Sequence, residues 1–165
     1  MNFNYSNTLE KMRILDRIGD NDVILNIHGS VNDKKYPIIL GYGDDTHERY
    51  KEVEQSGEDE FLRFIKSFRY QRSDVYRNLI NIMSENHFDV FTLGHSCGLS
   101  DRTLLKTIFE HKHCSTISRF YYKGEDEDFY RRMAISRHFD DKLLMRERLL
   151  PFDFGLEIPQ MEQVN

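Results

Sequence analysis

A histidine, a serine, a cysteine and an aspartate lie close together in the segment from Gly94 to Asp101, whose sequence is GHSCGLSD. A β-branched and aromatic run ends directly at Gly94, and apolar residues recur at helical spacing after Asp101, so this segment is predicted to turn a strand into a helix. Strand ends and helix N-termini converge at such turns, where α/β proteins hold ligands. We therefore expect this turn to form one wall of a functional site.

One hypothesis for the turn is a serine hydrolase. Residues 94–98 fit G-x-S-x-G, the nucleophile elbow that presents a serine while the following amide stabilises an oxyanion. The chain then offers Asp126 or Asp128 as the acid and His138 as the base, in the order of α/β-hydrolases. Ser96 is the nucleophile in this hypothesis.

A second hypothesis makes the turn a nucleotide-binding wall. Ser100 is the natural helix N-cap, with Asp101 in the first turn, so the helix is predicted to begin well after Ser96 and not at it, as an elbow requires. Ser96 and Asp101 then bond ribose hydroxyls, while Gly94 lets a nucleotide approach the backbone beside His95. Asp101 has an equally good structural explanation, because an acidic residue in the first turn stabilises a helix.

Three other predicted strands also end in residues that could do chemistry. Asn4 ends the first, His28 the second, and the third is followed by Gly41, Gly43 and Asp44. Carboxyl ends of parallel strands share one edge of a sheet, so all these groups are expected to converge with the 94–101 turn. With an ordinary pKa of about 6.5, a histidine fixed at a strand end is suited to act as a general base, although such residues are more often structural.

Other reactive side chains have plainer explanations. His111, His113 and Cys114 are spaced like metal ligands, but no fourth ligand is apparent, so no metal is predicted. Cys97 approaches a helix N-terminus, where a thiol pKa can fall, but a role as a small buried residue is the better explanation.

The elements that would position these groups alternate along the chain. Strands are predicted over 1–5, 23–27, 37–40, 90–93 and 116–122, and helices over 8–18, 48–55, 61–68, 75–83, 101–109 and 141–150. After an acidic turn behind the last strand, a further helix is predicted to carry Phe129, Tyr130, Met133 and Ala134. This order predicts a single α/β domain over 1–150, with a mostly parallel sheet in three layers, and a poorly ordered tail over 151–165. The apolar stripes of the helices, including Phe61, Phe64 and Phe68, are expected in the core.

Composition narrows the class of protein. The formal net charge of −5 over 165 residues argues against general nucleic-acid binding. No signal peptide and no apolar run long enough to cross a bilayer is visible, so no membrane partner is predicted. The two cysteines suit a reducing compartment, and the cytoplasm is the predicted location.

Several segments, taken in order, resemble the bacteriophage abortive infection family AbiH. They are NFNYSNTLE (2–10), NIHGSV (26–31), ILGYGDD (39–45), KSFRY (66–70), LGHSCGLSDRTLLKTIFEH (93–111), ISRHF (135–139) and DKLLMRERLL (141–150). The resemblance implies a bacterial antiphage defence protein that answers to a phage-derived or host protein trigger. AbiH-like proteins begin with a strand and a Gly-Asn-Gly-Phe-Asp type loop, which has no counterpart before Met1. The resemblance therefore implies the carboxyl-terminal part of a longer protein, without the first strand and the glycine-rich loop.

The order N-x-N-Y, H-G-S and G-x-S before an aspartate is also similar to sirtuin-like NAD-binding domains. This similarity implies a Rossmann-like or sirtuin-like fold with NAD as the ligand. It places Asn4 near the nicotinamide ribose, His28 as the base, and Gly94, Ser96 and Asp101 at the adenosine half. The implied reaction is cleavage of the nicotinamide glycosidic bond. Three function classes stay open: an NAD-cleaving enzyme, a Ser96 hydrolase, and a non-enzymatic sensor or partner-binding module.

Overall fold

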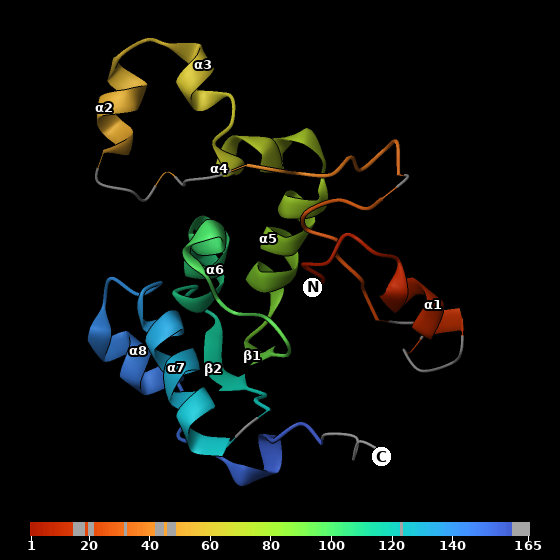
Figure 1. Ribbon diagram of the computed structural model, residues 1–165, viewed down its shortest axis with the longest axis vertical. Coiled ribbons are helices and arrows are strands. Elements are labelled where there is room, and N and C mark those ends of the chain that lie inside the picture. The colour runs from red at the N-terminus through yellow and green to blue at the C-terminus, as the bar shows by residue number, and fades with distance from the viewer. Residues whose placement is uncertain are drawn as a thin grey trace, which may run out of the picture. The chain divides into compact units, whose positions relative to one another are not determined.

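The computed structural model describes residues 1–14, 19, 22–31, 33–41, 45, 49–122 and 124–159 (Figure 1). The chain divides into two compact units, Met1–Ile82 and Met83–Asn165, and each is described by itself. It mixes helices with a small parallel sheet, as an α/β protein does. The single domain predicted over 1–150 stays a prediction.

The first unit is mainly helical. Its helices are α1 (Thr8–Ile14), α2 (Tyr50–Gln55), α3 (Asp59–Leu62), α4 (Lys66–Arg69) and the greater part of α5 (Val75–Glu85), with a short 3-10 turn at Tyr70–Arg72. The predicted continuation of the first helix to residue 18 lies outside the described residues, as does residue 48 of the second.

The helix predicted over 61–68 is wrong in its continuity and in its core stripe. The chain is helical on both sides of Ile65, which is itself extended with φ −68° and ψ 125°. Only Ile65 of this stripe is buried, whereas Phe61, Phe64 and Phe68 are 59%, 45% and 42% exposed. The extended residue interrupts the helical repeat, so the phenylalanines no longer share the buried face that an unbroken helix would give them.

The first two predicted strands meet in a single parallel bridge between Asn2 and Asn26. Asn2 N donates to Leu25 O at 2.8 Å, and Ile27 N donates to Asn2 O at 3.1 Å. The next donor of a parallel ladder, Asn4 N, bonds the side-chain oxygen of Asn2 at 3.1 Å instead. A side chain that takes a backbone donor in this way competes with the sheet, so the pairing stops after one bridge.

The strand predicted over 37–40 does not form in the described residues. Its Ile39 N donates to His28 O at 2.8 Å, but Gly29 turns the chain with φ 76° directly after His28. Built on Gly29, a Cβ would lie 2.3 Å from the carbonyl oxygen of Pro37. This close approach requires glycine and brings the two segments together without a ladder.

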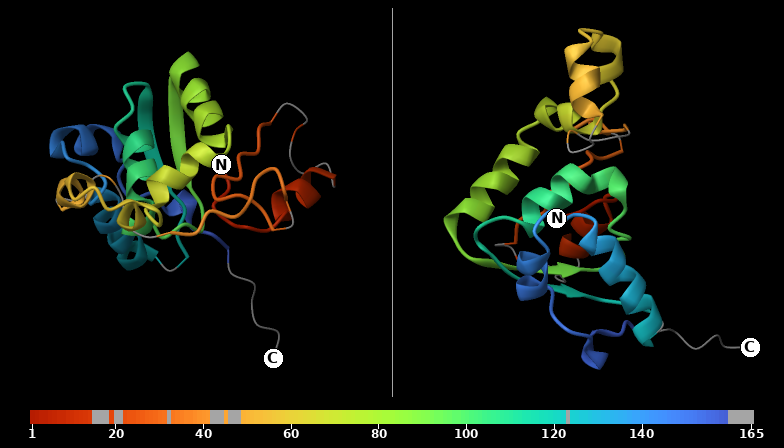
Figure 2. Two further views of the ribbon diagram at one scale, coloured as in Figure 1. Left: turned by 90° about the horizontal axis from the view of Figure 1, so that it is seen from above. Right: turned by 90° about the vertical axis from the view of Figure 1, so that its left-hand side faces the viewer.

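The second unit contains a β–α–β motif. β1 (Phe88–Thr92) and β2 (Cys114–Arg119) pair in parallel, and α6 (Arg102–Phe109) connects them. The strands lie side by side in Figures 1 and 2. Parallel strands need such a crossover, and this part of the predicted α/β pattern is confirmed.

The predicted apolar stripe of α6 forms the core of the second unit. Its buried residues are Leu104, Leu105, Ile108 and Phe109. They recur at helical spacing, so one face of the helix leaves water while the other keeps its polar groups. The rings of Phe109 and Phe139 stack 5.9 Å apart, which extends this core beyond the helix.

Two further helices, α7 (Gly124–Ser136) and α8 (Lys142–Arg148), correspond to the predicted helix that carries Phe129 to Ala134 and to the one predicted near 141–150. The acidic residues that were predicted to form a turn before the first of these helices lie in its first turn. Asp141 caps α8, since its carboxylate accepts from Leu143 N at 2.8 Å and Leu144 N at 3.2 Å. After α8 the chain runs beside β2, where Leu149 bridges Ile117.

The first part of the predicted tail, residues 151–159, continues along the end of β2. Tyr121 N donates to Leu156 O at 3.3 Å, and Ile158 N donates to Tyr121 O at 2.7 Å. These backbone bonds give residues 151–159 an ordered path that composition does not reveal. Residues 160–165 lie outside the described part of the chain.

Among the helices that the structure describes, none combines the length and the apolar composition that crossing a bilayer requires.

Candidate functional site

His28, the predicted base, is buried in the first unit with 4% of its surface exposed. Its Nδ1 lies 3.2 Å from the carbonyl oxygen of Phe3. A carbonyl oxygen only accepts hydrogen bonds, so Nδ1 carries the proton and, in the neutral ring, Nε2 is the basic nitrogen. The rings of Phe3, Tyr5 and Tyr70 surround the imidazole at centroid distances of 5.4, 6.0 and 6.4 Å.

This arrangement brings Asn4 to His28, because Phe3 and Tyr5 flank Asn4 in the chain and both contact the histidine ring. The side chain of Asn4 is exposed. The two residues predicted as catalytic thus lie in one neighbourhood of the first unit.

A chain of polar side chains, which the sequence patterns did not single out, supports this neighbourhood. Asn2 Nδ2 donates to Asn26 Oδ1 at 2.8 Å, and Asn26 Nδ2 donates to Glu10 Oε1 at 2.6 Å. The other carboxylate oxygen of Glu10 is buried without a hydrogen-bond partner among the described residues. The available signal was Asn26 itself, a polar residue inside an apolar predicted strand.

Gly41 has a packing role in the structure. Built on Gly41, a Cβ would lie 2.6 Å from the carbonyl oxygen of Phe64 and 3.2 Å from the Cα of Lys66. Glycine is therefore needed for the close approach of two backbone segments. Its predicted nucleotide contact stays a prediction, and Gly43 and Asp44 lie outside the described residues.

In the second unit, α7 and the residues after it hold the 94–101 turn through its carbonyl groups. Arg131 Nη1 donates to His95 O, and His138 Nε2 donates to Cys97 O at 2.7 Å. Gly94 and Cys97 both have positive φ, 67° and 52°. The sequence patterns missed the role of Arg131 and assigned a different one to His138.

His95 and Asp101 face each other inside the turn. Cys97 N donates to His95 Nδ1 at 3.0 Å, so in the neutral ring the proton is on Nε2, which lies 3.5 Å from Asp101 Oδ2. Asp101 is 7% exposed. A short 3-10 turn, Leu99–Asp101, precedes α6, and Asp101 occupies the N-cap position without a side-chain capping bond. The prediction of Ser100 as the N-cap is therefore wrong.

Cys97 is a buried thiol. It is 2% exposed, and burial raises its pKa to about 11. The thiolate that a nucleophile needs is therefore absent near neutral pH, which favours the structural explanation of this cysteine.

Asp128, His138 and Ser96, which were proposed for a hydrolase triad, do not assemble. Both oxygens of Asp128 are bound by Arg119, and one also accepts from Arg132 Nε at 2.7 Å. His138 is fully buried, with Nε2 bound to Cys97 O and no hydrogen-bond partner for Nδ1 among the described residues. Exposed Ser96 thus receives no base from His138, and His138 receives no acid from Asp128.

His111, His113 and Cys114, which are spaced like metal ligands, lie in a segment held by hydrogen bonds with the backbone. His113 Nδ1 bonds Met83 O at 3.2 Å, and His113 N donates to His111 Nδ1 at 3.2 Å. Within the described ranges, no group of three or more His, Cys, Asp and Glu side chains is arranged to hold a metal ion.

His138 predicts a pH dependence of stability. Burial lowers its pKa below the ordinary 6.5, although its bond to Cys97 O opposes the shift. The unfolded chain thus takes up this proton at a higher pH than the folded chain. The contribution of neutral His138 is complete above pH 6.5 and is lost as the pH falls through the window below it.

We expect the stability of His138→Gln to fall less as the pH is lowered, because glutamine keeps a donor near the position of Nε2 but does not titrate. Urea unfolding between neutral and acidic pH measures the slope. Burial also lowers the pKa of His111, so the stability of the variant still depends on pH to some extent. An unchanged slope in His138→Gln would show that His138 does not carry the effect.

The predicted site residues thus form two local groups, one around His28 and one within the 94–101 turn. The first belongs to Met1–Ile82 and the second to Met83–Asn165. Their convergence in one pocket stays a prediction.

Comparison with known proteins identifies the family. No curated protein and no solved structure is significantly similar to the chain. The family model described as "Bacteriophage abortive infection AbiH" matches residues 1–123, which include the surroundings of His28, the 94–101 turn and the β–α–β motif. Since this match covers most of the 165 residues, the chain belongs to the bacteriophage abortive infection family AbiH.

Proposed function

We propose that this AbiH-family protein serves antiphage defence by binding and cleaving NAD or a related nucleotide, with His28 as the general base and Asn4 beside the nicotinamide ribose. The observation that carries the proposal is the contact of both neighbours of Asn4, Phe3 and Tyr5, with the His28 ring. This contact places the exposed amide of Asn4 near His28, whose tautomer is fixed by its bond to Phe3 O.

The chemistry follows from that tautomer. With the proton on Nδ1, Nε2 of His28 takes a proton from water as its oxygen bonds the ribose carbon. The glycosidic bond breaks, and nicotinamide leaves with the electron pair as a neutral molecule. Because the imidazole is 4% exposed, we propose that one of the aromatic rings packed against it moves aside when the substrate enters.

For the second unit by itself, we propose that the 94–101 turn contributes nucleotide-binding residues. Ser96 is exposed, which suits a bond to the ribose of the adenosine half. Asp101 is buried against His95, and we propose that both residues bind the nucleotide beside Ser96. Gly94, Gly41, Gly43 and Asp44 complete the predicted binding residues. The β–α–β motif is then one part of a three-layer, Rossmann-like or sirtuin-like fold.

The test uses His28→Asn in the protein expressed from its native gene context. Asparagine places a donor close to the position of Nδ1 and so keeps the bond to Phe3 O, but it has no basic nitrogen. We expect phage infection to lower cellular NAD with the unchanged protein and to leave it constant with His28→Asn. An enzymatic NAD assay of infected cells measures this. Ser96→Ala is expected only to weaken the depletion.

The control is His87→Ala, which removes an exposed histidine of the second unit. It should deplete NAD as the unchanged protein does. Constant NAD with the unchanged, folded protein overturns the proposal. Growth arrest that survives His28→Asn would instead support a non-enzymatic sensor or partner-binding module.

A further inference from the structure

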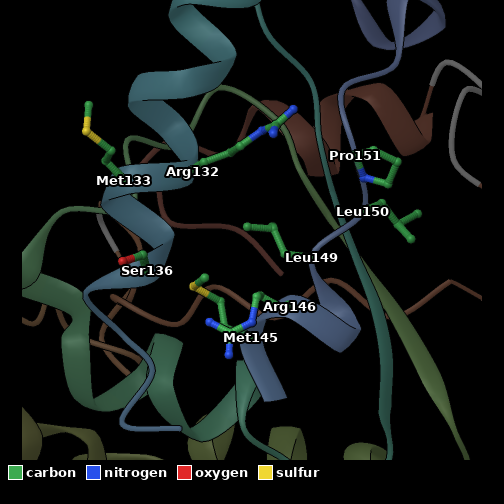
Figure 3. A pocket seen from close by; sticks show the side chains of 8 residues that line it. All are labelled: Arg132, Met133, Ser136, Met145, Arg146, Leu149, Leu150 and Pro151. Carbon is green, nitrogen blue, oxygen red and sulfur yellow. The ribbon is translucent and has the colours of Figure 1, made fainter. Parts of the chain in front are cut away.

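A pocket of about 480 Å³ lies in the second unit between α7, α8 and the chain that follows α8 (Figure 3). Its walls are mostly apolar, and two arginines and a serine complete them. The lining residues are Arg132, Met133, Ser136, Met145, Arg146, Leu149, Leu150 and Pro151. Methionine side chains are flexible and polarizable, and binding surfaces that adapt to a partner often use them.

The two arginines of the pocket differ in their ion pairing. Arg132 Nε donates to Asp128 Oδ2 at 2.7 Å, which fixes the direction of that side chain on α7. Arg146 on α8 is exposed and forms no ion pair with any residue that the structure describes. In a chain of net charge −5, an unneutralised arginine beside an apolar wall favours an occupant with carboxylates.

The backbone at the pocket wall disfavours one common binding mode, the addition of a β-strand. Leu150 N donates to Ile117 O at 3.0 Å, and Leu150 O accepts from Arg119 Nη1 at 2.6 Å. Pro151 has no N–H to donate. The backbone of Leu150 and Pro151 thus has no N–H to donate to an added strand, which favours an occupant that binds through side chains.

We propose that this pocket binds an amphipathic helix of a partner protein, whose apolar residues enter between α7 and α8 and whose flanking carboxylates meet Arg146. Leu150, which is 38% exposed, supplies apolar surface for the helix to cover. Helices recognised in this way place anchors at positions i, i+3 or i+4, and i+7, with charged residues beside the stripe. The site is separate from the nucleotide chemistry proposed for His28 and holds whether or not that chemistry occurs.

The test measures binding of a fluorescein-labelled synthetic helix of about 15 residues, with leucine and methionine on one face and glutamates beside them. Fluorescence polarisation with the full chain is expected to show saturable binding that weakens with salt. Arg146→Glu is expected to reduce the affinity about tenfold or more, and Leu150→Gln to reduce it severalfold. A helix with lysine in place of glutamate should bind Arg146→Glu better than the unchanged protein.

Matched controls separate the pocket from the general surface. Arg137→Glu makes the same charge change as Arg146→Glu at an exposed arginine that does not line the pocket. Leu143→Gln is the control for Leu150→Gln, because Leu143 is 60% exposed and does not line the pocket. Both should leave the affinity unchanged. The proposal is overturned if Arg137→Glu weakens binding as much as Arg146→Glu, or if a scrambled helix of equal charge binds equally well. Binding of dodecanoate without binding of the helix would also overturn it, in favour of a small anionic amphiphile.

Discussion

Replacing Asp128 with asparagine is expected to destabilise the second unit by about 3–5 kcal/mol, the usual cost of removing one partner from a buried ion pair. Arg119 and Asp128 have side chains that are each 1% exposed. Arg119 Nη2 donates to Asp128 Oδ2 at 2.9 Å while Arg119 Nη1 holds Leu150 O at 2.6 Å. The variant leaves a guanidinium without its counter-charge in a place that water does not reach.

Urea unfolding followed by far-ultraviolet circular dichroism measures the effect, because the chain has no tryptophan to report it. Asp126→Asn is the control, since Asp126 lies exposed on the same helix and should change stability little. Arg119→Met combined with Asp128→Leu removes both charges and should be less damaging than Asp128→Asn alone. Equal stability of Asp128→Asn and Asp126→Asn would show that the pair is not buried in solution.

Replacing Gly29 with alanine is expected to destabilise the first unit by about 2–5 kcal/mol, from roughly 1–2 kcal/mol for a left-handed alanine and a further ~1–3 kcal/mol for overpacking. The new Cβ would lie 2.3 Å from Pro37 O and 2.8 Å from Tyr36 O, and both are backbone atoms. Neither can turn away as a flexible side chain would.

Gly57→Ala is the matched control. Gly57 has φ 72°, close to the 76° of Gly29, but no atom lies within 4 Å of a Cβ built there. It should therefore show the conformational cost alone. The difference between the two variants, measured by urea unfolding, isolates the contact with residues 36 and 37. No difference between them would mean that the two segments are not in contact.

Part of the fold was predictable because it depends on local repeats. The stripe of α6 was visible as apolar residues at helical spacing, and all four of its members are buried. The run before Gly94 and the run after Cys114 were visible as strands, and they pair in parallel across the helix between them. Periodicity predicts such elements because burial of one face follows directly from the repeat.

Other elements were decided by partners that no local pattern contains. Phe61, Phe64 and Phe68 have helical spacing, yet the extended Ile65 interrupts the helix and leaves them exposed. The first strand pair stops after one bridge because the side chain of Asn2 takes the backbone donor of Asn4. Residue propensities do not predict where one side chain takes the place of one backbone hydrogen bond of a sheet.

For the candidate site, the sequence by itself determined the family resemblance, the 94–101 turn between a strand and a helix, and the pairing of Asn4 with His28 as candidates. Only the tertiary structure decided the role of His138, which sequence order had offered as the base of a triad. It bonds Cys97 O, 41 residues away, and lies fully buried. Chain order says which groups are available, but hydrogen bonding and burial between distant residues determine which of them can react.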